Sequence, residues 1–120
     1  MSDEPIDDAA FAELLDTVGG DREFLAELVD TYIADSPVQF ADLRAALAAG
    51  DAGSARRAAH SLKSTSASMA AGRLSAICRG IEAACAAGQL GGLEARVDEA
   101  AAEYVLVEAA LTAAVAGDAS

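Results

Sequence analysis

The sequence is poor in aromatic residues, proline, cysteine and basic residues, and it contains one histidine. Two prolines and sparse β-branched residues disfavour an all-β fold. No apolar run approaches the roughly 20 residues that a membrane-spanning helix requires. Eight basic residues stand against 20 acidic ones, a formal net charge of −12. Because nucleic acids and anionic membranes repel so acidic a chain, we expect neither as a partner.

The two cysteines and the absence of known nucleotide-binding motifs limit which ligands and cofactors the chain could bind. Cys78 and Cys85 lie two helical turns apart, about 10 Å, which is too far for a disulfide. We expect both to be small buried residues, and with one histidine they do not form a zinc site. No glycine-rich nucleotide-binding loop is present. We therefore expect no metal, no cofactor and no ATP site. The acidic start of the chain lacks the features of a secretory signal, so the expected location is the cytoplasm.

Alanine is abundant: 32 of the 120 residues are Ala, the strongest helix former. Apolar residues recur at helical spacing in five segments with short connections. The expected fold is therefore all-α, an antiparallel up-down four-helix bundle with a short additional N-terminal capping helix. We assign residues 1–6 to a polar N-terminal tail and 7–117 to a single domain, expected to be a monomer. The apolar patterns cover about 11–18, 24–47, 52–70, 73–87 and 93–111.

Two sequence features predict where these helices are interrupted. Ser36-Pro37-Val38-Gln39 has the pattern of an N-cap, a first-turn proline and a capping-box glutamine, so we expect a kink or a short break there. Gly72 is expected to end the third helix.

The surroundings of His60 differ from the rest of the chain. The stretch 52–81 holds five of the eight basic residues and no acidic one. Four polar residues three or four positions from His60 share its helix face, namely Arg56, Arg57, Lys63 and Ser64. Three cations and a hydroxyl beside one imidazole suit a phosphate-accepting site, and Arg56 and Arg57 are candidate partner-binding residues. A lone surface histidine is more often an ordinary surface residue, so the charge pattern alone leaves both interpretations open.

The single histidine lies in the run Ala59-His60-Ser61-Leu62-Lys63-Ser64-Thr65-Ser66-Ala67. This run resembles the phosphoacceptor motif of histidine-containing phosphotransfer (HPt) domains, approximately A-H-x-L-K-G-S-[SA]. The similarity extends over about residues 8–115. Ser64 stands where glycine is commoner, and Ala70-Ala71-Gly72 replaces a usual Gly-Ala pair.

The resemblance implies a phosphocarrier in a phosphorelay of a two-component system. Nε2 of His60 would carry a phosphoryl group between aspartates of response-regulator receiver domains, and a hybrid histidine kinase is a further candidate partner. Glu82, in the next helix, would hold Nδ1–H of His60. Small Ser64 and Thr65 would let a receiver approach closely. Lys63, three positions after His60, is expected to reach a phosphoryl group on Nε2 and stabilise its charge.

Two other functions compete with this interpretation. The chain could be an interaction module that binds signalling partners without carrying phosphate, or an enzyme that uses His60 as a general base. An acid-labile, base-stable phosphate on His60 distinguishes the phosphocarrier from both.

Overall fold

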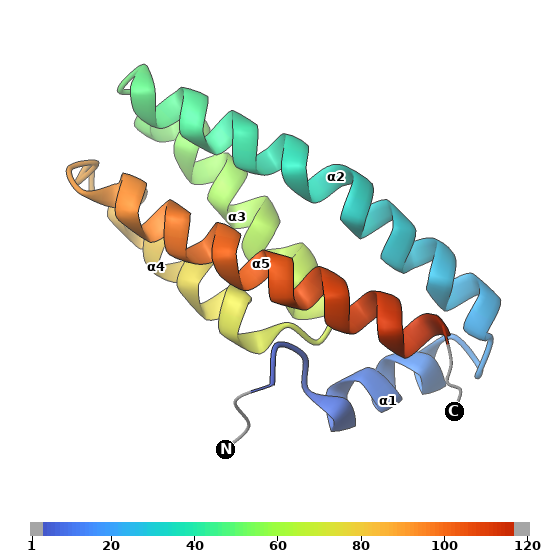
Figure 1. Cartoon of the computed structure of the whole chain (residues 1–120). Coiled ribbons are helices and arrows are strands. Elements are labelled where there is room, and N and C mark those ends of the chain that lie inside the picture. Colours follow the sequence, from blue (N-terminus) through green and yellow to red (C-terminus); the bar gives the residue numbers. More distant parts are fainter. Residues whose placement is uncertain (1–3, 117–120) are drawn as a thin grey trace.

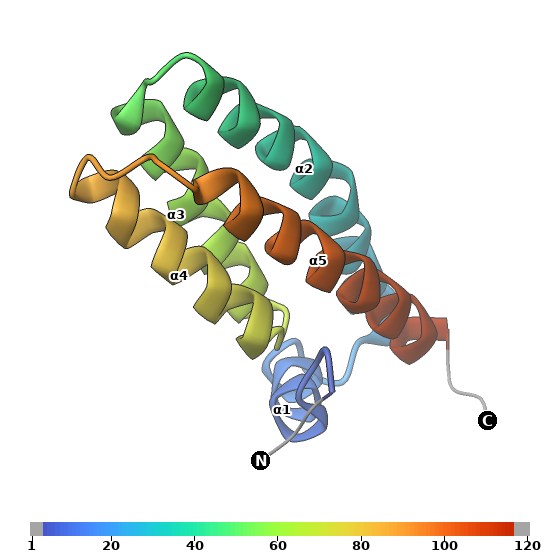
Figure 2. The same cartoon turned by 60° about the vertical axis from the view of Figure 1, so that its left-hand side comes forward.

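The computed structural model describes residues 4–116, which form five helices and no strand. Helices α2 to α5 form an antiparallel up-down bundle in which α2 and α4 each pack against α3 and α5 (Figures 1 and 2). Helix α1 lies across one end of the bundle, beside the α3–α4 turn (Figure 1). The predicted all-α bundle with a capping helix is confirmed. The helices are α1 (Asp8–Thr17), α2 (Arg22–Ala48), α3 (Ala52–Ser68), α4 (Gly72–Ala86) and α5 (Leu93–Ala116).

The first three helices begin at aspartate N-caps. The Asp7 side chain accepts from the backbone N–H groups of Ala9 and Ala10, and Asp21 and Asp51 accept from the third residue after each cap. These carboxylates satisfy N–H groups that have no partner inside the helix. The short polar side chains thereby fix where each helix starts.

The core lies between the four long helices and uses mostly small and aliphatic side chains. Its fully buried members include Leu25, Leu43, Leu62, Leu74, Ile81, Val97, Val107 and Leu111. Ile6, which the sequence assigns to the polar tail, is 5% exposed and belongs to the same core. The next residue, Asp7, donates its backbone N–H to the Ala70 carbonyl at 2.9 Å. The segment before α1 is therefore anchored on the α3–α4 turn.

The sequence predicted a kink or a short break at Pro37. The break is absent, because α2 runs without interruption from Arg22 to Ala48. Pro37 has no N–H, so the Ile33 carbonyl loses its partner within the helix. The Tyr104 hydroxyl of α5 donates to that carbonyl at 3.3 Å instead. Ser36, interpreted from the sequence as a cap, is 1% exposed and faces the core.

The end of α3 also differs from the prediction. The helix ends at Ser68, and Ala70 rather than Gly72 adopts the left-handed conformation, with φ of 64°. Gly72 is instead the first residue of α4. An alanine in this conformation has a steric cost that glycine avoids. Ala70 is buried, so its methyl group is packed in the core.

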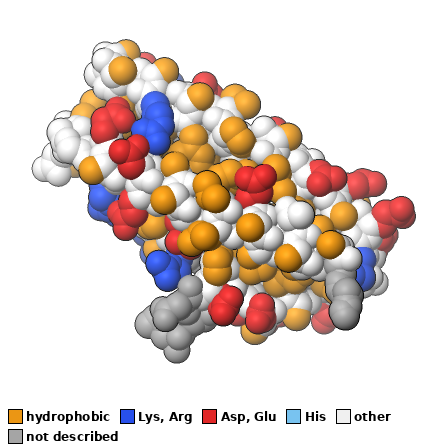
Figure 3. Space-filling model, in the orientation of Figure 1, with side chains coloured by type: hydrophobic (Ala, Val, Ile, Leu, Met, Phe, Trp, Pro, Cys, Tyr) orange, Lys and Arg blue, Asp and Glu red, His pale blue; other side chains and the backbone are white. Residues whose placement is uncertain are grey.

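The two faces of the bundle differ in charge. The face formed by α2 and α5 carries hydrophobic side chains among scattered acidic ones (Figure 3). His60 and most of the basic residues belong to α3 and α4. Between residues 4 and 116, no helix is both long enough and apolar enough to cross a membrane.

Candidate functional site

His60 lies in the middle of α3 on the side that faces away from the core. Its neighbours Ala59 and Leu62 are fully buried, whereas the His60 side chain is 60% exposed. The periodicity of the helix explains the difference, because residue 60 is rotated by about 100° from residue 59. A partner can therefore reach the imidazole without any change in the fold.

Glu82 lies beside His60 because α4 packs antiparallel against α3. Its Oε2 is 2.9 Å from Nδ1 of the imidazole, across 22 positions of sequence. The Glu82 side chain is 15% exposed and lies one position after the fully buried Ile81. A carboxylate accepts hydrogen bonds, so Nδ1 donates the proton and Nε2 keeps its lone pair. The contact therefore makes Nε2 the nucleophilic atom.

The second oxygen of Glu82 is bound by Lys63. The Lys63 ammonium lies 2.7 Å from Oε1, so one carboxylate bridges the lysine and the histidine. The hydrogen bond from Lys63, followed by that from His60, lowers the pKa of Glu82, and burial opposes the shift. Glu82 is accordingly ionised at neutral pH. Lys63, which the sequence places beside a phosphoryl group on Nε2, binds Glu82 in this structure.

The backbone around Lys63 is held by a residue that the sequence analysis did not single out. The Ser75 hydroxyl of α4 donates to the Lys63 carbonyl at 3.0 Å. Ser75 is buried between the two helices, where its small side chain allows close packing. No motif or spacing in the sequence indicates this contact, which depends on the register between α3 and α4.

The two small residues after Lys63 point in different directions. Ser64 is exposed on the outer surface of α3. Thr65 is half-buried and donates its hydroxyl to the Ser61 carbonyl at 2.9 Å. It also lines a small cavity between α2 and α3, with Tyr32 and Met69 among its neighbours. Only Ser64 therefore shares the open surface of the imidazole.

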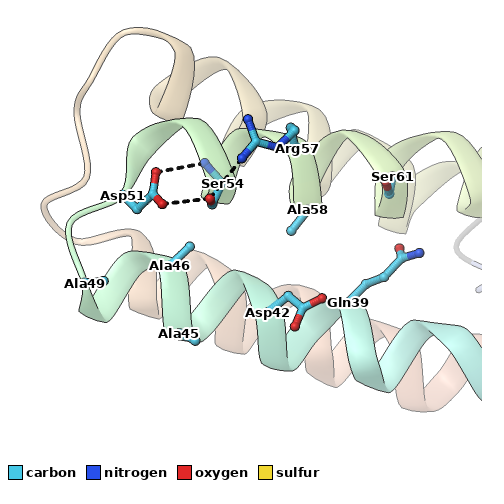
Figure 4. A pocket seen from close by; sticks show the side chains of 10 residues that line it. All are labelled: Gln39, Asp42, Ala45, Ala46, Ala49, Asp51, Ser54, Arg57, Ala58 and Ser61. Carbon is cyan, nitrogen blue, oxygen red and sulfur yellow. Dashed lines mark hydrogen bonds between the residues drawn. The ribbon is translucent and has the colours of Figure 1, made fainter.

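Arg56 and Arg57 are exposed and line a shallow depression together with His60 and Ser61. Arg57 donates to the Ser54 hydroxyl at 3.0 Å, as Figure 4 shows. Arg56 makes no side-chain hydrogen bond or ion pair within the described part of the chain. The basic face predicted around His60 is therefore present, with Arg56 available to a partner.

A larger groove lies on the neighbouring face, between α2 and α3 (Figure 4). His60 does not line it, although Arg57 and Ser61 border both this groove and the depression at His60. The Gln39 side chain lies in the groove, and its buried Oε1 has no hydrogen-bond partner in residues 4–116. The groove is thus next to the histidine but separate from it.

Metal ligation does not explain the arrangement at His60. Within the range 4–116, no three His, Cys, Asp or Glu side chains are grouped so that they could hold a metal ion. Cys78 and Cys85 are both buried and free, and burial raises the pKa of the Cys78 thiol to about 12. Neither thiol takes part in the site.

Comparison with known proteins identifies the family. The family model described as Hpt domain matches residues 27–117. The crystal structure of histidine-containing phosphotransfer protein B (HptB) from Pseudomonas aeruginosa PAO1 is 30% identical, with a TM-score of 0.86. That match covers 95% of this chain and 96% of the other. A search of curated proteins found no match. The chain therefore belongs to the Hpt domain family and is a histidine phosphotransfer protein of two-component signalling.

Proposed function

We propose that His60 accepts a phosphoryl group from an aspartate of one receiver domain and passes it to an aspartate of another. The observation that carries this proposal is the 2.9 Å contact between Nδ1 of His60 and Glu82 on an otherwise exposed imidazole. The contact fixes the tautomer, aims the ring, and leaves Nε2 free to react.

The transfer is a displacement at phosphorus. The Nε2 lone pair attacks the phosphorus of the aspartyl phosphate, and the bond from phosphorus to the aspartate oxygen breaks. The electron pair of that bond leaves with the aspartate carboxylate, and Nδ1 keeps its proton. Positioning and charge stabilisation supply most of the catalysis in such a reaction.

The charges around His60 suit a receiver as partner. Receiver domains present acidic groups at the phosphorylated aspartate, and the face around His60 is basic through Arg56, Arg57 and Lys63. Complementary charge speeds the encounter and aligns two surfaces that meet transiently. The partners proposed are response-regulator receivers and a hybrid histidine kinase. We further propose that the chain works as a cytoplasmic monomer without its own ATP site.

The test is phosphoryl transfer from a panel of receivers loaded with labelled phosphate. Wild-type protein should become labelled, and the label should be stable in base and labile in acid. His60→Ala should keep its helical content and melting temperature, because the side chain is exposed, and should accept no label. A receiver that binds the wild-type chain and transfers nothing would favour the interaction module instead. Label retained on the His60→Ala variant would place the phosphate elsewhere.

A further inference from the structure

The Glu82 carboxylate binds two groups that carry different charges before the reaction. Oε1 holds the Lys63 ammonium at 2.7 Å, and Oε2 holds the Nδ1–H of His60 at 2.9 Å. We propose that Lys63 exchanges partners once the phosphoryl group is on Nε2. Its ammonium then leaves Glu82 and binds the phosphoryl oxygens, while Glu82 keeps its contact with Nδ1–H. This inference rests on the proposed function, because it describes the site after His60 has been phosphorylated.

The change of charge at His60 drives the exchange. Attack through Nε2 leaves the ring substituted at both nitrogens, so the ring becomes cationic while the bound phosphoryl group is a dianion. Glu82 then lies beside a cationic ring, and Lys63 lies near two negative charges. One ion pair is replaced by two, in a site where Glu82 is largely shielded from water and charges interact strongly.

The geometry allows Lys63 to make this move alone. Lys63 is three positions after His60, on the same side of α3, and its side chain is 27% exposed. Its flexible four-carbon stem carries a compact ammonium that can change partners by rotation of single bonds. The α3 backbone stays in place, because Leu62 is fully buried and Ser75 holds the Lys63 carbonyl.

The other basic residues near His60 are not linked to the imidazole through Glu82 as Lys63 is. Arg56 is exposed one turn before His60, and Arg79 is exposed one turn before Glu82. Neither makes an ion pair with Glu82 in the described part of the chain. A change at either position therefore alters the surface charge without altering the carboxylate that holds the ring.

The exchange has a consequence for the second half of the reaction. When Lys63 leaves, the full charge of Glu82 acts on Nδ1–H and keeps that proton on the phosphorylated ring. A protonated ring departs from phosphorus as neutral imidazole, which is a better leaving group than the anion. Glu82 thus favours passage of the phosphoryl group to the next aspartate, while Lys63 stabilises the group as it arrives and leaves.

The direct test is to phosphorylate the purified protein with phosphoramidate, a small donor that requires no receiver, and to determine the structure. The expected result is Lys63 Nζ at hydrogen-bond distance from a phosphoryl oxygen and no longer paired with Glu82, with Nδ1 still on Glu82. A phosphorylated His60 with Lys63 still on Glu82 overturns the exchange and leaves the proposed function intact. If neither phosphoramidate nor any receiver phosphorylates His60, both proposals fail.

Two variants should separate the two halves of the reaction. Lys63→Ala should slow acceptance from a receiver by about 10- to 100-fold, the size expected for loss of a hydrogen bond to a charged group. Glu82→Gln keeps an acceptor for Nδ1–H and releases Lys63, so acceptance should stay within about threefold of wild type. Outward transfer by Glu82→Gln should be about tenfold slower, because the ring loses the charge that retains its proton.

Arg96→Ala is the matched control, because it removes a paired cation on α5, where Arg96 binds Glu99 at 3.2 Å. Both of its rates should equal those of wild type. Equal slowing of acceptance and outward transfer in Glu82→Gln would contradict the exchange, and so would a Lys63→Ala variant that behaves like Arg96→Ala.

Discussion

Oε2 of Glu82 in α4 lies 2.9 Å from Nδ1 of His60 in α3, so the orientation of the imidazole is set from the neighbouring helix. Replacing Glu82 with Ala removes the only acceptor that the described residues offer to Nδ1–H. We expect phosphoryl acceptance to fall by about tenfold, since a hydrogen bond to a charged carboxylate contributes about 1.5 kcal/mol net. Single-turnover transfer from a loaded receiver measures the effect.

A spectroscopic signature accompanies the loss in rate. In wild type, nitrogen NMR of the imidazole should report the proton on Nδ1, and Glu82→Gln should retain that tautomer. Glu82→Ala should populate the other tautomer, in which the proton blocks Nε2. An unchanged tautomer in Glu82→Ala, with an unchanged rate, would mean that the carboxylate has no role in positioning His60.

The stability of the bundle should depend on pH through Glu82. Lys63 first, and His60 second, lower the pKa of this carboxyl in the folded state. A depressed pKa contributes stability that is present above the unfolded value, about 4.3, and is lost as the pH falls through the folded value. Glu82→Gln lacks this contribution at every pH. In urea unfolding, the free energy of unfolding should therefore be higher for wild type than for Glu82→Gln at neutral pH, and the difference should become smaller in acid. A difference that does not change with pH would contradict this role of Glu82.

How far the sequence could predict this site depends on the kind of contact. The exposure of His60 follows from periodicity, because the residue stands one position outside the apolar stripe that includes Ala59 and Leu62. The position of Glu82 follows from the resemblance and from antiparallel pairing, which places the next helix opposite the first. The partner of Lys63 could not be predicted, because a long flexible side chain selects among nearby anions only once the fold exists.

Two features of the fold that the sequence did not predict involve residues in positions unusual for their type, a buried glutamate and an alanine in the left-handed conformation. Glu103, on α5, is 7% exposed, and its carboxylate lies 3.7 Å from Arg73. An apolar pattern does not mark such an acid as part of the interior. Ala70 likewise takes a left-handed φ of 64° that sequence rules reserve mainly for glycine. Burial of its methyl group offsets part of the backbone cost.

The orientation of α3 can be tested by placing a charge on each side of it. Ala59 is fully buried and Ala67 is exposed on the same helix. Ala59→Asp buries a carboxylate with no partner, which costs several kcal/mol, so the variant should unfold or lose its sharp melting transition. Ala67→Asp should change the free energy of unfolding by about 0.5 kcal/mol or less, as surface substitutions usually do. Equal melting temperatures for the two variants would show that α3 is rotated from this arrangement.

The uninterrupted α2 depends on the hydroxyl of Tyr104, which donates to the Ile33 carbonyl left without a partner by Pro37. Tyr104→Phe removes this donor and should destabilise the bundle by about 1 kcal/mol, the typical net contribution of a hydrogen bond. Pro37→Ala restores the N–H and gives Ile33 a partner within the helix. In a Pro37→Ala background, Tyr104→Phe should therefore lower the free energy of unfolding much less. The difference between the two backgrounds measures the coupling between Pro37 and the Tyr104 hydroxyl. The ring of residue 104 and its packing against Tyr32 and Phe40 are kept in Tyr104→Phe, so the variant tests the hydroxyl alone. If urea unfolding gives the same cost for Tyr104→Phe in both backgrounds, the hydroxyl does not stabilise α2 through the Ile33 carbonyl.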